Sequence, residues 1–376
     1  MRIAIISLPL SYNYGGYLQC YALMETLRLM GHDVFYLQRE NGRNPSKIKR
    51  IVDSTKGLLE YTGLGELVYF FEKKTNTGIF YKTRNFRLFV QKYIKSISPV
   101  LRTTQQVKEY CLKQEIDAYI TGSDQIWRGE YQRSVNDAFL GFAPVNALKI
   151  AYAPSLGTSV WEFSEQDTLL IEKLLNTFHA ISVREQDGAD LLKEHLKLNI
   201  DPICVLDPTF LLPKEKYIEI AKSESKRTGV LTYILNNNEE KARLINEFCR
   251  KNSLKSYSVI NPKTNSSVIV GSQGYSVEQW LAGFRDADYV MTDSFHAVVF
   301  SIIFNKPFWV FENPKRGNSR LLNILNLFDC KDRFIAVGTN TDNFDWKCPV
   351  DWSRINKKKE LLIHDSLCFL KESLNV

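Results

Sequence analysis

The sequence lacks most of the short motifs by which enzyme and metal-binding classes are recognised. It contains no CxxC pair, no HExxH helix, no GxSxG turn, no EF-hand loop, and neither a GxGxxG nor a P-loop signature. Its seven cysteines are scattered, a pattern typical of reduced thiols in a cytoplasmic protein. We therefore expect no bound metal, and no nucleotide held by a Walker or dinucleotide loop.

Long apolar runs are absent as well. No segment approaches the roughly 20 apolar residues that span a bilayer. The first apolar run, Ile3–Leu10, is too short for a signal peptide, and Ser11–Gly16 follows it in place of a small-residue cleavage site. This run is better interpreted as a buried first strand, and we expect a cytoplasmic protein.

The net charge of +7 comes from one segment. Residues 43–95 hold 12 Lys and Arg against 4 Asp and Glu, a net of +8, so the other residues sum to −1. The apolar spacing of this segment predicts helices. Two interpretations stay open: a solvated basic face, or a patch that docks on the inner face of the cell membrane. Nucleic-acid binding is disfavoured because no motif for it accompanies the segment.

Strand-like and helix-like segments alternate through both halves of the 376 residues. This alternation predicts an α/β fold with two doubly wound, Rossmann-like domains that face a cleft. We place the N-terminal domain at 1–178, with a basic helical insertion at about 43–95, and the C-terminal domain at 179–345. A tail helix within 346–376 is expected to pack back on the N-terminal domain.

Two polar loops follow predicted strands of the N-terminal domain. Asn13, Gly15 and Gly16 lie between the first strand and the first helix, where backbone N–H groups could hold an anion or a sugar hydroxyl. Asp124 and Gln125 follow the strand at 118–121 and suit hydroxyl recognition or proton abstraction. The alternatives are a tight turn without a ligand and an aspartate that caps the next helix.

The sharpest candidate lies where a third predicted strand ends. His296 stands in the first turn of an apolar helix, just after Asp293 and Ser294, one of which is expected to cap the helix. Helix N–H groups attract an anion there, and the imidazole can donate to phosphate or move a proton near neutral pH. A structural histidine is the alternative.

Arginines near other strand ends could hold the same anion. Arg184 directly follows a strand and could grip a carboxylate or phosphate with two N–H groups, although a salt bridge with Glu185 is equally expected. Arg316 and Arg320 precede and enter a later helix and could close over the anion.

Five motifs together resemble the polysaccharide pyruvyl transferase family. No single motif is specific, and the resemblance depends on their order and spacing from residue 3 to about 330. The motifs are Asn13-Tyr-Gly-Gly-Tyr-Leu-Gln19, Gly122-Ser-Asp-Gln-Ile-Trp127, Ser182-Val-Arg-Glu185, Asp207-Pro-Thr209 and Thr292-Asp-Ser-Phe-His-Ala297. The resemblance implies a GT-B-like fold, phosphoenolpyruvate as donor, and a cyclic pyruvyl ketal formed on a sugar diol.

The resemblance also implies a phosphoenolpyruvate site in the second domain, built on His296 and Arg184. Many members have Arg-Leu-His where this chain has Ser294-Phe295-His296. One anion-binding arginine is thus absent from its usual place, and Arg316 or Arg320 would replace it.

We accordingly expect a phosphoenolpyruvate-dependent transferase without a further cofactor. His296 would bind the phosphate or act as the acid, Arg184 would grip the anion, and Asp124 would orient or deprotonate a hydroxyl of a lipid-linked sugar. Ser294 is assigned to the donor site, and Asn13, Gly15, Gly16 and Gln125 to the acceptor site. Two other functions stay open: a glycosyltransferase that uses a nucleotide sugar, and a non-catalytic scaffold of polysaccharide assembly.

Overall fold

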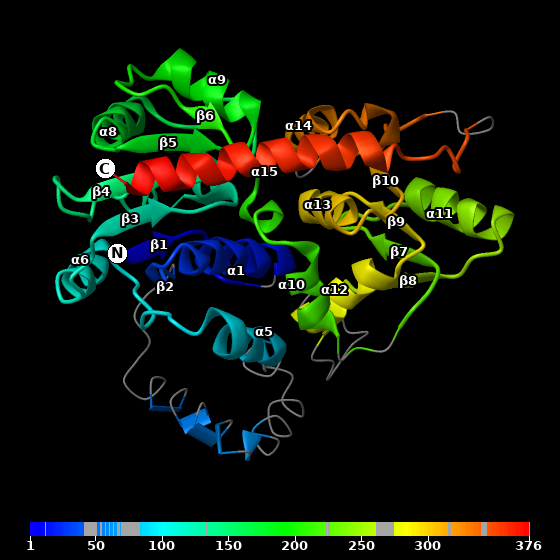
Figure 1. Cartoon of the computed structure of the whole chain (residues 1–376), viewed down its shortest axis with the longest axis horizontal. Coiled ribbons are helices and arrows are strands. Elements are labelled where there is room, and N and C mark those ends of the chain that lie inside the picture. Colours follow the sequence, from blue (N-terminus) through cyan, green and yellow to red (C-terminus); the bar gives the residue numbers. More distant parts are fainter. Residues whose placement is uncertain are drawn as a thin grey trace.

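The computed structural model contains two parallel α/β domains and a long C-terminal helix (Figure 1). It describes every residue except 12, 41–50, 53–54, 57, 60, 63, 66–67, 69–82, 133, 223, 225, 261–273, 315–316, 340–343 and 376. The prediction of two doubly wound α/β domains is confirmed.

The first domain is built on six parallel strands in the order β2-β1-β3-β4-β5-β6. Five of its strands are short, largely buried runs, as expected where helices cover both sides of a sheet, whereas the edge strand β6 is exposed. The strands are β1 (Arg2–Ile6), β2 (Asp33–Tyr36), β3 (Ala118–Thr121), β4 (Leu148–Ala151), β5 (Ala180–Val183) and β6 (Ile203–Cys204). The helices are α1 (Tyr14–Leu29), α5 (Arg84–Phe89), α6 (Thr104–Cys111), α7 (Val135–Ala138), α8 (Glu165–Leu175) and α9 (Gln186–His195).

The second domain has five described strands in the order β11-β10-β9-β7-β8, again parallel. Its central helix α13 is buried along its whole length, because apolar side chains surround it. The strands are β7 (Val230–Tyr233), β8 (Ser256–Ser258), β9 (Tyr289–Thr292), β10 (Phe308–Phe311) and β11 (Phe334–Ile335). The helices are α10 (Lys214–Ala221), α11 (Glu239–Lys251), α12 (Val277–Asp286), α13 (Phe295–Ile303) and α14 (Ser319–Leu327).

The predicted domain boundary at 178 and 179 is wrong. β5 pairs with β4 through Ile150 and Ala180, and β6 pairs with β5, so both strands belong to the first sheet. The chain leaves the first sheet after Cys204 and enters the second domain through a short 3-10 turn at Pro208–Phe210 and α10. A buried parallel strand has the same local pattern in either sheet, so the sequence pattern could not assign these two strands.

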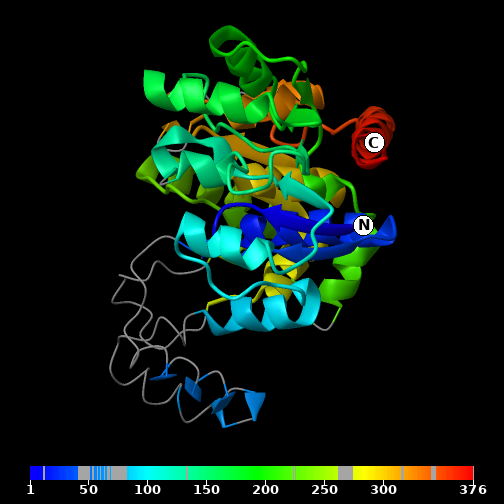
Figure 2. The same cartoon turned by 90° about the vertical axis from the view of Figure 1, so that its left-hand side faces the viewer.

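The C-terminal helix α15 (Trp352–Leu374) crosses from the second domain back to the first (Figure 1). Near its start, Lys358 pairs with Asp329 of the second domain at 3.1 Å. Farther along, Ser366 Oγ accepts a hydrogen bond from Leu206 N at 3.0 Å, beside the end of β6. Figure 2, which shows this helix end-on, places it on one flank of the molecule, outside both sheets.

The basic insertion is only partly described. Its last residues form α5 and one π-helical turn, Val90–Ile94, and here Phe86 and Phe89 are buried against α1. This end of the insertion is therefore part of the domain core, not a solvated face. Most of its Lys and Arg residues lie outside the described part, and so does the predicted membrane patch.

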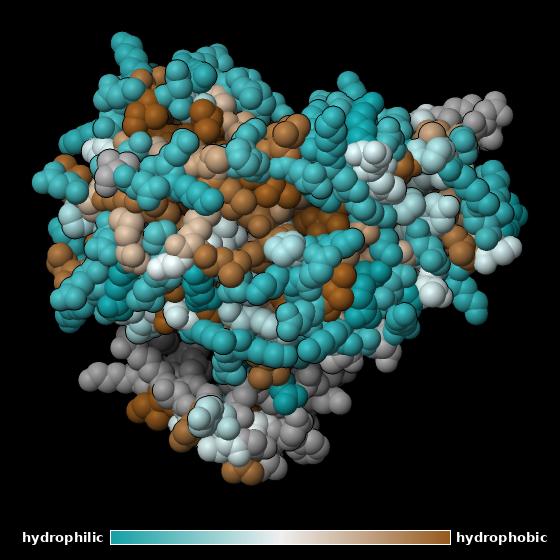
Figure 3. Space-filling view, viewed as in Figure 1, coloured by the Kyte–Doolittle hydropathy of each residue, from teal (hydrophilic) through white to brown (hydrophobic). Residues whose placement is uncertain are grey.

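The molecular surface on the side of α15 is mostly hydrophilic. Apolar side chains gather near the middle of this face, around the place where the domains meet (Figure 3). Within the described ranges, no helix combines the length and the apolar character that crossing a bilayer requires.

Candidate functional site

Polar side chains from both domains meet where the strands end. The carboxyl ends of parallel strands share one edge of a sheet, and the two sheets face each other along these edges. Asp124 follows β3, Arg184 follows β5 and Asp207 follows β6, all in the first domain, while His296 follows β9 in the second. The predicted donor site therefore lies between the domains and not within the second, because Arg184 belongs to the first sheet.

The Arg184 guanidinium is enclosed by carboxylates. Its Nε donates to Glu185 at 2.8 Å and its Nη1 donates to Asp207 at 3.0 Å. Asp124 Oδ1 lies 3.9 Å from the same Nη1. Burial opposes the charge, but the three carboxylates outweigh it and raise the pKa of Arg184. The expected salt bridge with Glu185 is thus present, and the buried Nη2 has no partner among the described residues.

Asp207 connects the two domains. Its Oδ2 accepts hydrogen bonds from Arg184 and from Ser123 Oγ, and lies 3.5 Å from Nε2 of His296. Its Oδ1 accepts from the N–H of Thr209 at 3.0 Å. Burial favours the protonated acid, but His296, Arg184 and Thr209 outweigh it and hold the pKa of Asp207 well below its ordinary range. Asp207 is therefore ionised at neutral pH, within ion-pair distance of the His296 imidazole.

His296 occupies the first turn of α13, as predicted. Ser294 is the N-cap residue, yet its side chain makes no capping hydrogen bond, and its N–H donates to Thr292 Oγ1. Asp293 accepts hydrogen bonds from the N–H groups of Leu235 and Asn236. Ser294 thus stands at the expected N-cap position, but neither its side chain nor that of Asp293 makes a capping hydrogen bond to the helix. The first-turn N–H groups of α13 carry no side-chain cap, which suits an anion.

Gly15 packs against His296 across the domain junction. A Cβ atom on Gly15 would lie 2.1 Å from Nδ1 of His296, so a larger residue would displace the imidazole. A Cβ atom on Gly16 would lie 3.5 Å from Asn13 Nδ2, which is an ordinary contact. The first glycine thus positions the histidine, whereas the second has no such requirement.

Two arginines, one from each domain, lie beside the ring of Phe295. The guanidinium carbon of Arg184 lies 4.1 Å from the ring centroid, and that of Arg320 lies 6.0 Å from it. Burial, and then the charge of Arg184, lower the pKa of Arg320 to about 10. Two guanidinium groups thus repel each other here, and an anion in contact with both would offset that repulsion. Arg316 lies outside the described residues.

Asp124 adopts a backbone conformation that side chains rarely occupy. Its φ of 68° and ψ of −176° fall in a region used almost only by glycine. Its side chain does not cap the following turn, so the capping alternative does not hold; Oδ2 instead accepts from Asn13 Nδ2 at 3.3 Å. Strain of this kind costs about 1–3 kcal/mol and is typical of functional positions.

The other predicted acceptor residues are less accessible. Gln125 is buried, and its Nε2 packs where a Cβ atom of Gly157 would lie. Gly15 is covered by the imidazole of His296. The predicted acceptor residues line neither the cavity beside Arg184 nor the larger cavity bounded by Arg128 and α14.

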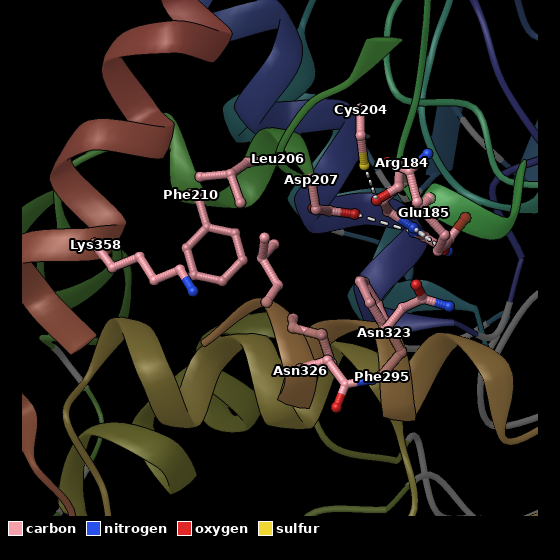
Figure 4. A pocket seen from close by; sticks show the side chains of 13 residues that line it. Arg184, Glu185, Cys204, Leu206, Asp207, Phe210, Phe295, Asn323, Asn326 and Lys358 are labelled. Carbon is pink, nitrogen blue, oxygen red and sulfur yellow. Dashed lines mark hydrogen bonds and ion pairs between the residues drawn. The ribbon is translucent and has the colours of Figure 1, made fainter. Parts of the chain in front are cut away.

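A cavity of about 370 Å³ lies directly beside the Arg184–Asp207 pair. Phe295 and Phe210 form part of its wall, and Figure 4 shows Lys358 reaching toward it from α15. The cavity thus combines apolar surface with cationic groups at opposite ends. In the described part of the chain, no group of three or more His, Cys, Asp or Glu is arranged to hold a metal ion.

Two contributors to this site were not predicted from the sequence. Asp207 stood only in a motif of the resemblance, although its position after a strand could have singled it out. Phe295 gave no signal, because an aromatic residue in an apolar helix is indistinguishable from a core residue until the arginines beside it are known.

The sequence pattern of the family described as polysaccharide pyruvyl transferase matches residues 13–315. The chain belongs to this family. The protein is therefore a transferase of polysaccharide biosynthesis. No curated protein sequence matches it.

Several solved structures have a fold similar to that of this protein. The UDP-GlcNAc 2-epimerase from Neisseria meningitidis, bound to UDP-GlcNAc, is 9% identical with a TM-score of 0.56, and the match covers 100% of this chain and 99% of that one. The epimerase from Methanocaldococcus jannaschii is 13% identical with a TM-score of 0.50, covering 96% and 93%. A glycosyltransferase from Rickettsia africae is 9% identical with a TM-score of 0.50, covering 100% and 96%. The predicted GT-B-like fold is confirmed.

Proposed function

We propose that the protein transfers the pyruvyl group of phosphoenolpyruvate to two hydroxyls of a sugar and forms a cyclic ketal. The observation that supports this most is the pair of arginines, one from each domain, beside Phe295 and next to His296. Phosphoenolpyruvate carries a phosphate and a carboxylate, and a cationic pair near an uncapped helix N-terminus suits both.

The anion would bind between the domains. Arg184 contributes its remaining Nη2 donor, Arg320 its positive charge, and the first turn of α13 its N–H groups. The cavity of about 370 Å³ beside Arg184 has room for a small acid. Arg320 then replaces the arginine that the family usually has two residues before the histidine.

The reaction needs one acid and one base. A protonated His296, paired with Asp207, gives its proton to the methylene carbon of phosphoenolpyruvate, and C2 becomes electrophilic. One sugar hydroxyl attacks C2, the C–O bond to phosphate breaks, and the second hydroxyl closes the ketal. Two hydroxyl protons replace the one that His296 gave and the one that phosphate carries away, so the reaction balances without another cofactor.

Asp124 is our proposed base. Its carboxylate is held by Asn13 and lies near Arg184, at the first-domain side of the junction. It would orient or deprotonate the attacking hydroxyl, and its strained backbone fixes the direction of the side chain.

The test is incubation with phosphoenolpyruvate and a panel of lipid-linked and synthetic glycosides. We expect phosphate release together with the mass gain of a ketal. His296→Asn should lower kcat at least about 100-fold at saturating phosphoenolpyruvate, since general acids contribute at least that factor. His364→Asn, which alters an exposed histidine of α15, is the control. Near-normal turnover of His296→Asn would refute its catalytic role.

Two further measurements distinguish this proposal from the other candidate functions. Thermal stabilisation by nucleotide sugars, and not by phosphoenolpyruvate, would favour a glycosyltransferase. The absence of turnover with tight protein association would favour a scaffold. A lipid-linked acceptor and peripheral membrane contact through residues 43–95 belong to this proposal, and co-sedimentation with liposomes tests them: no preference for anionic lipid would reject the membrane contact.

A further inference from the structure

A second cavity, of about 660 Å³, lies between the domains. Arg128 and Asp187 contribute to its wall from the first domain, and α14 contributes Asn323 and Asn326 from the second. These two asparagines are three residues apart and lie on one face of the helix. Both also line the smaller cavity beside Arg184, so the two cavities adjoin along α14.

Among the described residues, the wall of this larger cavity is mostly polar and contains one arginine and one aspartate. Arg128 donates to Glu130 at 2.5 Å, so its charge is already offset. Asp187 adds a negative charge from the first turn of α9. A nucleotide diphosphate would meet no free cation among the described lining residues.

Side-chain amides and hydroxyls make up much of the remaining wall. The lining hydroxyls come from Thr158, Ser159 and Ser319, and the amides from Asn318, Asn323 and Asn326. Such groups donate and accept, as the hydroxyls of an uncharged sugar require. Asn326 is exposed, and its amide has no hydrogen-bond partner among the described residues. The Nδ2 of Asn323 already donates to the Ser319 carbonyl at 2.9 Å, so Asn326 is the freer of the two.

We propose that this cavity binds the acceptor as an uncharged saccharide, with Asn326 and Asn323 hydrogen-bonded to its hydroxyls. The proposal rests on the proposed function and gives the acceptor a place other than the loop at Asn13–Gly16. Because the two cavities adjoin along α14, a sugar in the larger one presents hydroxyls toward the donor cavity beside Arg184. Two substrates that must react with each other require such an arrangement.

The kinetic test uses the full chain with phosphoenolpyruvate and the best acceptor of the glycoside panel. Asn326→Leu should raise the KM for the acceptor about tenfold, the loss expected for one or two hydrogen bonds. Because Asn326 also lines the donor cavity, the KM for phosphoenolpyruvate can rise as well, but it should rise less than the KM for the acceptor. Asn326→Asp, which keeps the size of the side chain, should weaken binding of the acceptor by a similar factor. Asn356→Leu, on α15 and outside both cavities, is the control. An unchanged acceptor KM in both Asn326 variants overturns the proposal.

A binding test separates this proposal from the reaction itself. Saturation-transfer NMR with a set of neutral methyl glycosides, without phosphoenolpyruvate, should show binding that Asn326→Leu weakens and that UDP-glucose does not displace. If this holds and no ketal forms with any acceptor, the cavity assignment stands and the proposed reaction fails. Binding that UDP-glucose displaces, or no binding of any neutral glycoside, overturns the cavity assignment.

Discussion

The two domains meet through two regions of opposite character. Near α1 and α12 the contact is aromatic: Tyr14 stacks on Trp280 with ring centroids 5.7 Å apart, and the Tyr14 hydroxyl donates to the Tyr275 carbonyl at 2.7 Å. At the strand ends the contact is charged, with Asp207 beside both Arg184 and His296. We call these the aromatic contact and the charged contact.

The two contacts differ in what they contribute to the stability of the domain junction. Burial of aromatic area stabilises a domain junction without depending on pH. Buried charges must first lose their hydration, so an ion pair seldom stabilises more than apolar groups of the same volume would. We therefore expect the aromatic contact to contribute most of the stability of the domain junction, and the charged contact to matter for the reaction proposed above.

Trp280→Ala should give the largest effect on stability. Trp280 is completely buried against Tyr14, Tyr233 and Phe300, and truncation of such a residue costs about 3–5 kcal/mol. Urea unfolding should show the same loss at pH 6 and pH 8, because no titrating group is removed. Trp161→Ala, at a partly exposed tryptophan outside the junction, should cost less. A strongly pH-dependent loss for Trp280→Ala would break the comparison.

Asp207→Asn should lower the free energy of unfolding by an amount that depends on pH. Removing one member of a buried ion pair costs about 3 kcal/mol at neutral pH. Since folding lowers the pKa of Asp207, its contribution is complete above the unfolded value near 4 and is lost as pH falls below it. The stability of wild type and variant should therefore converge in acid, as measured by urea unfolding at a series of pH values.

Asp137→Asn is the matched control for this prediction. Asp137 is buried and pairs with Arg39 at 2.7 Å, away from the charged contact. The Asp137→Asn variant should be less stable than the wild type, and its turnover with phosphoenolpyruvate should be unchanged. If Asp207→Asn loses no more stability relative to wild type at neutral pH than it does in acid, the charged contact does not work as described.

Gly15→Ala should disturb the place where the first-domain backbone touches His296, our proposed catalytic acid. The added Cβ would overlap Nδ1 of His296, and relief of such a clash costs about 1–3 kcal/mol. We expect kcat to fall at least tenfold, because the imidazole moves from Asp207. Gly16→Ala has room for its Cβ and should be neutral or slightly more stable. Equal effects of the two substitutions in activity and unfolding measurements would contradict this assignment.

Arg320→Met should change stability the least, and it should raise stability where the other substitutions lower it. Folding lowers the pKa of Arg320 to about 10, so the charged form is disfavoured in the folded state at every pH below that value. Removal of the charge should therefore stabilise the unliganded protein, by about 1 kcal/mol. Phosphoenolpyruvate should raise the Tm of the wild type but not that of the variant. An equal rise in both would exclude Arg320 from the donor site.

The sequence predicted most residues of the charged contact and its surroundings, although not Asp207, and it predicted their arrangement less well. Polar residues after buried strands identified Asp124, Arg184 and His296, because strand ends of parallel sheets converge. The assignment of Arg184 to the second domain failed, since sheet membership depends on pairing between distant strands. The closeness of Arg320 to Arg184 depends on the packing of α14 against the first domain, which no local pattern encodes.

The acceptor side shows the same limit. Gly15 was predicted to bind the acceptor, whereas the structure shows it in close contact with His296, which comes from a helix 280 residues later in the chain. Asparagines on an exposed helix face, such as Asn326, are common and gave no signal until the cavity was visible.

The path of α15 has a consequence for biosynthesis. Leu370 and Leu374 are buried in the core that also contains β1 and α1, and Ser366 satisfies the N–H of Leu206. The ribosome releases the N-terminal half of a chain first, and domains usually fold in that order. Here the domain that is synthesised first acquires its last core residues only when α15 emerges. A nascent chain that ends before residue 352 thus exposes apolar surface of its oldest domain, where a chaperone would bind.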